Sequence, residues 1–146
     1  MMLELVSGAV DVEKTLAKWY KDNKKSNYGA FVSFVGTIRD EDGIEGLSFD
    51  IYEPILQSWF QKWQEQAQKQ DALIYMIHSK GDVMLHESSY IAAVFSPKRR
   101  IGLEFIDQFV EDFKANAPIW KYDLKDGKRI YAADRSTPMQ GAGLLA

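Results

Sequence analysis

Hydrophobic residues recur with two different spacings along the chain. A spacing of two, or an unbroken apolar run, is typical of strands, whereas a spacing of three to four is typical of amphipathic helices. The spacing predicts helices after Asp11, from Glu53-Pro54 and from about Lys98 to Asn116, and strands over 2–6, 30–38, 47–52, 72–78, 89–96, 119–124 and 129–133. The expected order of elements is therefore β-α-β-β-α-β-β-α-β-β.

Turn-forming residues connect most of the predicted strands. We expect residues 39–43, RDEDG, to reverse the chain into a hairpin, and residues 125–128 to close a second hairpin. Lys80-Gly81-Asp82 is predicted to be a turn before the strand over 89–96. Because hairpins outnumber helical crossovers, the sequence predicts a hammerhead-like α+β fold with a mostly antiparallel sheet and about three packed helices. We expect one domain over 1–146, with a flexible tail from about residue 135.

Composition excludes several classes of protein. The 146 residues are 46% hydrophobic and 13% aromatic, which is enough apolar material for one core. The formal net charge of −3 argues against a nucleic-acid partner, because proteins that bind nucleic acids usually carry a basic face. No apolar stretch reaches the ~20 residues that span a bilayer, and the first residues lack the pattern of a secretion signal. We therefore expect a cytoplasmic protein without membrane contact.

The chain has no cysteine and only two histidines, His78 and His86. The absence of cysteine removes disulfides, thiolate metal sites, a cysteine nucleophile and a persulfide carried by this chain. No closely spaced set of histidines and carboxylates predicts a metal site, and we expect no cofactor. We interpret His78, at the end of a predicted strand, and His86, in a polar loop, as structural or solvated residues.

Basic residues stand at the ends of several predicted elements. They are Arg39 after a strand, Lys98-Arg99-Arg100 at a helix start, and Lys114 and Lys121 around a helix-to-strand corner. In an acidic protein, such a group predicts a local pocket for a phosphate or a carboxylate. Each position also has a structural explanation: a cation is favoured in the last turn of a helix, and the others are typical of solvated surface charge.

Lys114 and Lys121 carry the most specific expectation. Lys114 follows Val110 by four residues, which predicts a half-buried amine beside the apolar stripe of its helix. Lys121 follows Trp120 in an extended segment, so we expect these two side chains on opposite faces. If the two amines converge, each disfavours the charge of the other, and a neutral amine acts as a base or a nucleophile.

Three stretches resemble a known family: FVGTIRD at 34–40, SPKRR at 96–100 and, most specifically, FKANAPIWKYD at 113–123. On these motifs the chain resembles the large, catalytic subunit of molybdopterin synthase over essentially its full length. The resemblance implies a sulfurtransferase of molybdenum cofactor biosynthesis that converts cyclic pyranopterin monophosphate, also called precursor Z, to molybdopterin.

The resemblance also implies partners. A small ubiquitin-like subunit supplies the sulfur as a thiocarboxylate on its C-terminal Gly-Gly tail, which inserts into a pocket of the large subunit. The assembly implied is a homodimer core within a heterotetramer. A chain without cysteine is consistent with this scheme, because the sulfur then comes from the partner.

Particular residues take roles from the same resemblance. Lys114 matches the essential lysine, for proton transfer or for covalent attachment to the tail, and Lys121 matches the second lysine of the pocket. Lys98 and Arg99 match a pair that is contributed across the dimer. Further matches are the substrate contacts Thr37, Ile38, Arg39, Tyr122, Asp123 and Arg135 and the lining residues Phe34 and Val110.

One departure and two alternatives bear on this interpretation. The family commonly has His-Arg where this chain has Lys98-Arg99, so a histidine acid or base is missing there and Lys98 serves as a cation or an amine. A non-catalytic module that binds the small subunit's tail or a phosphate ligand would show binding without turnover. An oligomeric scaffold would bind neither.

Overall fold

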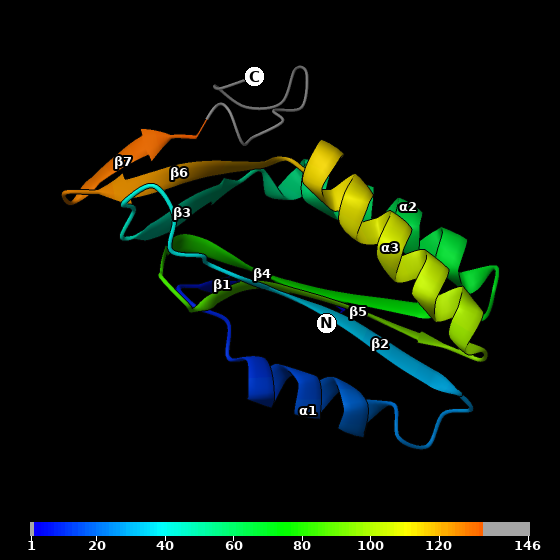
Figure 1. Ribbon diagram of the computed structural model, residues 1–146. Helices are drawn as coiled ribbons and strands as arrows, with labels where there is room; N and C mark the ends of the chain where they lie inside the picture. Colours follow the sequence, from blue (N-terminus) through cyan, green and yellow to red (C-terminus); the bar gives the residue numbers. More distant parts are fainter. Residues whose placement is uncertain (1, 133–146) are drawn as a thin grey trace.

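The computed structural model describes residues 2–132, which form three helices and a seven-stranded sheet (Figure 1). The elements follow the predicted order. Their bounds are β1 Leu3–Ser7, α1 Val12–Asp22, β2 Ala30–Thr37, β3 Gly46–Ile51, α2 Glu53–Gln68, β4 Leu73–Met84, β5 Ser88–Ser96, α3 Arg99–Asn116, β6 Ile119–Lys125 and β7 Lys128–Tyr131. The expected tail from residue 135 lies outside the described residues. None of the described helices has the length and apolar character needed to cross a bilayer.

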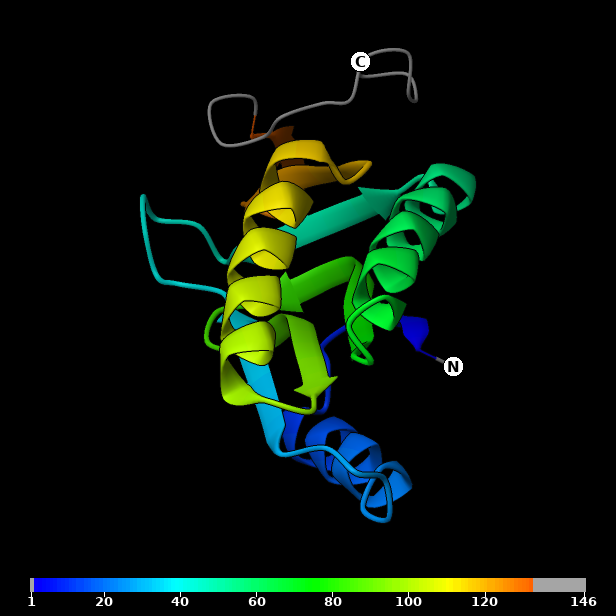
Figure 2. The ribbon, with the colours of Figure 1, turned by 90° about the vertical axis from the view of Figure 1, so that its right-hand side faces the viewer.

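The strands lie in the order β2-β5-β4-β3-β6-β7, and β1 pairs with β4 beside this path. The β1–β4 pair is parallel, and the other pairs between these strands are antiparallel. Figures 1 and 2 show α2 and α3 side by side on one face of the sheet and α1 on the opposite face. This arrangement confirms the predicted α+β fold with a mostly antiparallel sheet.

Apolar side chains fill the space on both faces of the sheet. Between the sheet and the pair α2/α3, the core includes Leu56, Met76 and Phe109, each fully buried. On the other face, Trp19 of α1 packs against a cluster that includes Ile91. Full burial of one such side chain stabilises the fold by roughly 1.5–3 kcal/mol, so these faces hold the helices on the sheet.

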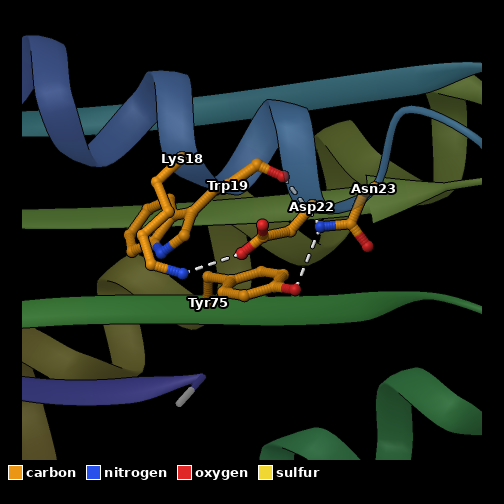
Figure 3. A network of polar contacts seen from close by, with 5 residues as sticks. All are labelled: Lys18, Trp19, Asp22, Asn23 and Tyr75. Atoms are coloured by element: carbon orange, nitrogen blue, oxygen red, sulfur yellow. Dashed lines mark hydrogen bonds and ion pairs between the residues drawn. The ribbon is translucent and has the colours of Figure 1, made fainter.

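A polar network fixes the end of α1 to β4 (Figure 3). The side chain of Asn23 donates hydrogen bonds to the backbone oxygen of Trp19 at 2.8 Å and to the Tyr75 hydroxyl at 3.0 Å. The Lys18–Asp22 ion pair, at 2.9 Å, lies on the more exposed side of the same turn. The buried amide therefore terminates the helix and ties it to the sheet at the same time.

The predicted hairpin between the second and third strands is wrong. β2 pairs with β5, whereas β3 pairs with β4 and β6. Just after β2, Ile38 exchanges backbone hydrogen bonds with Glu87 at 2.9 Å and His86 at 2.7 Å, which keeps the chain beside β5 before it crosses to β3. An alternating pattern shows that a strand has one buried face, but it does not show which strand is its neighbour.

The predicted turn at Lys80-Gly81-Asp82 is also wrong. β4 continues through these residues to Met84, pairing first with β5 and then, from Gly81 onward, with β3. Gly81 has a φ of 77°, a conformation that lets the strand bend between its two neighbours without ending. The reversal comes later, at a turn where His86 has a φ of 69°.

Two local predictions are confirmed. β6 and β7 form the second predicted hairpin, and Asp126 and Gly127 both have positive φ, as a two-residue turn between twisted strands requires. Asp11 caps α1, because its carboxylate accepts a hydrogen bond from the backbone N–H of Lys14 at 3.0 Å. Both features depend on neighbours in sequence, which explains why the pattern alone predicted them.

Candidate active site

A cavity of about 280 Å³ opens where the end of β2, the last turns of α3 and the start of β6 meet. His78 of β4 and neighbouring residues of β3 and β5 also line it. The lining residues are Phe34, Gly36, Thr37, Ile38, Leu47, Phe49, His78, Ser89, Tyr90, Val110, Phe113, Lys114, Ala117, Ile119 and Lys121. The cavity is therefore mainly apolar, with two amines and few other polar groups.

Lys114 and Lys121 both line this cavity, from the two sides of a short corner. α3 ends at Asn116, and Ala117 has an extended conformation with its N–H bonded to the Phe113 oxygen at 3.1 Å. Proline at 118 has no N–H to continue the helix, so the chain enters β6 at once. The corner thus brings an amine from a helix and an amine from a strand to one site.

The exposure of Lys114 differs from the expectation. Lys121 is half-buried, but Lys114 is exposed rather than half-buried. The reason is that the last turn of α3 extends past the covered part of the helix, so that Ala115 and Asn116 are exposed as well. Trp120 is buried and does not line the cavity, in agreement with its predicted position on the face opposite to Lys121.

Aromatic side chains give the cavity walls a fixed shape. The rings of Tyr90 and Phe113 stack with their centroids 4.2 Å apart and their planes at 8°. Phe34 and Val110, which the resemblance placed in the pocket, lie in its lining, as do Thr37 and Ile38. Apolar walls exclude water, so an anion that reaches the amines experiences a stronger attraction than it does at the open surface.

His78 is a titratable cavity residue that the sequence analysis did not place in the pocket. Its side chain is buried, with a residue exposure of 3%, and Nδ1 lies 2.7 Å from the backbone oxygen of Ser79. Burial lowers the pKa of His78 from 6.5 to about 4, although the hydrogen bond to Ser79 opposes this shift. A histidine inside an apolar strand was the available signal. His86, by contrast, is exposed in the turn before β5.

Among the described residues, three other predicted substrate contacts are not part of the cavity lining. Arg39 is exposed and paired with Glu41 at 2.9 Å. Tyr122 alternates with Lys121, and its ring stacks under the guanidinium of Arg129 at 4.0 Å. Asp123 lies further along β6, opposite Leu47 and the β7 strand, and is not part of the lining. Arg135 lies outside the described residues.

Lys98 and Arg99 lie at the opposite end of α3 from the cavity. The α3 part of the cavity lining begins at Val110, 11 residues after Arg99, which corresponds to about 16 Å at 1.5 Å per residue, so neither side chain reaches the cavity of its own chain. Both are exposed, and the first turn of α3 contains no acidic residue. The structure therefore brings Lys114 and Lys121 together but not Lys98 and Arg99.

The described residues contain no group of three or more histidine and carboxylate side chains that could hold a metal ion. The site instead presents ammonium donors above an apolar wall. Such a site fits an anionic ligand with an uncharged body, and a lysine amine supplies acid, base or nucleophilic chemistry beside it. The fold and the site thus define an α+β protein in which two lysines line a mainly apolar cavity.

Comparison with known proteins identifies the family. Residues 5–116 match the family described as MoaE protein. A molybdopterin synthase catalytic subunit from Helicobacter pylori strain 26695 is 48% identical over 145 residues, covering 99% of this chain and 100% of the relative. One from Dictyostelium discoideum is 28% identical over 135 residues, covering 85% of this chain and 80% of the relative. The chain belongs to the MoaE family of molybdopterin synthase catalytic subunits, which are enzymes of molybdenum cofactor biosynthesis.

Solved structures agree with this assignment. The chain superimposes on a protein in the complex of subunits 1 and 2 of the molybdopterin-converting factor from H. pylori 26695, with a TM-score of 0.93, 46% identity and full coverage of both chains. The MoaE protein from Burkholderia ambifaria MC40-6 has a TM-score of 0.72 and 20% identity, with 94% and 92% of the two chains covered, and shows the same fold. The predicted family is confirmed.

Proposed function

We propose that this chain transfers sulfur to cyclic pyranopterin monophosphate, as the catalytic subunit of a molybdopterin synthase. The observation that carries the proposal is the convergence of Lys114 and Lys121 on one apolar cavity. The cyclic phosphate and a thiocarboxylate are both anions, and an ammonium group close to either one stabilises it. The chain itself contains no cysteine to carry sulfur, so the sulfur donor is a partner.

The chemistry assigned to the cavity needs few groups. The thiocarboxylate sulfur attacks a substrate carbon that bears an oxygen, and the C–O bond of that carbon breaks as the leaving oxygen takes up a proton. The bond between the sulfur and the acyl carbon then breaks, which leaves the sulfur on the substrate. A water molecule, or first the Lys114 amine, takes the acyl group, and the tail finally leaves as a carboxylate. Lys114 is the residue we assign to proton transfer or to transient attachment, and Lys121 holds the anionic group.

The partner follows from the related complex. The H. pylori structure is a complex of subunits 1 and 2, and this chain matches one of its proteins along the full length. We propose that a small ubiquitin-like subunit binds this chain and inserts its thiocarboxylated Gly-Gly tail into the cavity. We further propose one domain over 1–146 and a cytoplasmic location, where such a biosynthetic enzyme meets its substrate.

A second copy of the chain completes the proposed pocket. Lys98 and Arg99 oppose the dipole at the start of α3, so an anion there relieves an unfavourable arrangement. Because they cannot reach the cavity of their own chain, we assign them to the cavity of the partner copy in a homodimer core. Arg39, Tyr122, Asp123 and Arg135 remain predicted substrate contacts.

Substitution of Lys114 tests the proposal. We expect Lys114→Ala, mixed with thiocarboxylated small subunit and precursor Z, to lose roughly 100-fold or more of the rate of dithiolene formation. Lys114→Arg keeps the positive charge but stays protonated, so it should still bind the small subunit and still fail in turnover. The measurement is single-turnover kinetics, with binding followed by titration calorimetry.

Lys69→Ala is the matched control, because Lys69 is exposed and lies at the end of α2, outside the cavity lining. It should retain wild-type kinetics. Full activity of Lys114→Ala would remove the role assigned to this amine. Tight binding without any turnover in the wild-type pair would instead favour a non-catalytic binding module.

A further inference from the structure

The imidazole of His78 is held in place by aromatic rings from three elements. Phe49 of β3 meets it edge-on, with centroids 4.9 Å apart and an interplanar angle of 85°. Tyr90 of β5 lies at 5.7 Å and Phe113 of α3 at 5.6 Å. The residue also lines the cavity. A buried ring with such contacts has one orientation, so its nitrogens occupy fixed positions.

The two ring nitrogens of His78 have different hydrogen-bonding roles. Nδ1 lies 2.7 Å from the Ser79 carbonyl oxygen, which can only accept, so Nδ1 carries the proton and donates. Burial lowers the pKa to about 4, and the imidazole is therefore neutral near pH 7. Nε2 is then an acceptor with a lone pair. Among the described residues the hydrogen bond of His78 is made by Nδ1, and a ligand in the cavity that His78 lines can supply a donor to Nε2.

This acceptor differs in kind from the charged groups of the cavity. The ammonium groups of Lys114 and Lys121 only donate, whereas the neutral Nε2 of His78 only accepts. A molecule that fits all three has an anionic group and a separate hydrogen-bond donor, such as an N–H group. An anion alone satisfies the amines but leaves the histidine without a donor.

We propose that Nε2 of His78 accepts a hydrogen bond from an N–H group of the ligand whose anionic group is held by Lys114 and Lys121. This inference rests on the proposed function and deepens it, because it makes His78 a ligand-contacting residue that contributes to specificity. Two molecules of the proposed reaction carry such an N–H: the pterin ring of the substrate and the backbone of the inserted Gly-Gly tail.

A pair of substitutions separates ligand contact from structure. His78→Asn places an amide N–H near the position of Nδ1, so it keeps a donor for the Ser79 oxygen but has no atom at Nε2. His78→Gln is longer and places an amide oxygen near the position of Nε2. If His78 only stabilises the bend of β4, the Asn variant should act like the wild type. If Nε2 contacts a ligand, His78→Gln should bind that ligand more tightly than His78→Asn does.

The expected effect is that of one neutral hydrogen bond. His78→Asn should weaken the affinity for the contacted ligand by roughly threefold to tenfold, and His78→Gln should recover most of this loss. Precursor Z and a small subunit with an ordinary C-terminal carboxylate are titrated separately, so that the ligand that responds identifies the source of the N–H. His86→Asn is the matched control at the other, exposed histidine.

A second readout uses the unaltered protein and does not depend on how the variants fold. The chain has two histidines, and the His86→Asn spectrum assigns the His78 imidazole ¹⁵N resonances. Saturation with the contacted ligand should shift the Nε2 resonance of His78 and leave Nδ1 nearly unchanged. Turnover in the wild type with an Nε2 resonance unmoved by either ligand overturns this inference alone. Absence of turnover in the wild type overturns the proposed function, and the inference with it.

Discussion

His78 and Lys114 lie at opposite extremes of solvent exposure within one cavity. The histidine has an exposure of 3%, whereas the lysine is exposed at the end of α3. Burial favours the uncharged imidazole, which accepts a hydrogen bond at Nε2. One small site therefore places a neutral acceptor beside the amines of two lysines, which is the combination that the proposed ligands require.

The burial of His78 predicts a dependence of stability on pH. The folded protein has a pKa of about 4 at this residue and the unfolded chain about 6.5, so between these values the unfolded state binds the proton more readily. The contribution of His78 is fully present above about pH 6.5 and is lost as the pH falls toward 4. At the lower limit the loss amounts to about 3 kcal/mol.

Urea unfolding of the wild type and of His78→Asn at several pH values measures this effect. The difference in unfolding free energy should change steadily between pH 6.5 and 4, with the wild type losing more, because the other titrating groups are common to both proteins. Parallel curves for the two proteins over this range would contradict the assigned titration.

At the scale of elements, Asp112 joins α3 to α2. One carboxylate oxygen accepts hydrogen bonds from the indole N–H groups of Trp59 at 2.8 Å and Trp63 at 2.7 Å, and the other accepts from Asn116 at 2.6 Å. Burial raises the pKa of Asp112, but the hydrogen bonds from Asn116, Trp63 and Trp59 outweigh it and hold the pKa below its usual value. The carboxylate stays charged and fixes the end of α3 that carries Lys114.

Removal of this carboxylate should weaken the contact between the two helices. We expect Asp112→Ala to lower the free energy of unfolding by about 2 kcal/mol, because two indole N–H groups lose their acceptor. Asp107→Ala, at an exposed position of the same helix, is the control and should change stability by less than about 0.5 kcal/mol. Equal urea midpoints for the two variants would show that the Asp112 contacts contribute no net stability.

At the scale of the whole molecule, the length of α3 separates two groups of basic residues. Lys114 lies at the cavity, and Lys98 and Arg99 lie at the other end of an 18-residue helix. A site that uses both groups needs two copies of the chain, each supplying one end of its helix. In a symmetric dimer the same contact occurs twice, so two equivalent sites result.

Mixed dimers test this arrangement. When Lys114→Ala chains and Arg99→Ala chains are unfolded together and refolded, each hybrid dimer should contain one intact site and one site lacking both side chains. An equal mixture should therefore recover about a quarter of the wild-type rate. If both residues served the cavity of their own chain, no hybrid site would be intact and the mixture would stay as inactive as the separate variants.

Local features of the fold followed from the sequence because they depend on neighbours along the chain. The order of helices and strands, the Asp11 cap and the turn at Asp126-Gly127 are set by hydrophobic spacing and by the conformations that these residues allow. The stretch FKANAPIWKYD likewise indicated the family and the corner that holds Lys114 and Lys121. Each of these features is determined by the residues of one short segment, so the sequence of that segment is enough to predict it.

Only the tertiary structure decided which segments meet. Strand alternation did not show that β2 pairs with β5 rather than β3, and the glycine at 81 looked like a turn although it bends a continuous strand. His78 lines the cavity because side chains of β3, β5 and α3 pack around it. Lys98 does not line the cavity of its own chain, because the rigid helix α3 places it at the opposite end. The sequence determined the elements and the lysine corner, whereas the composition of the site depended on long-range packing, which no local pattern contains.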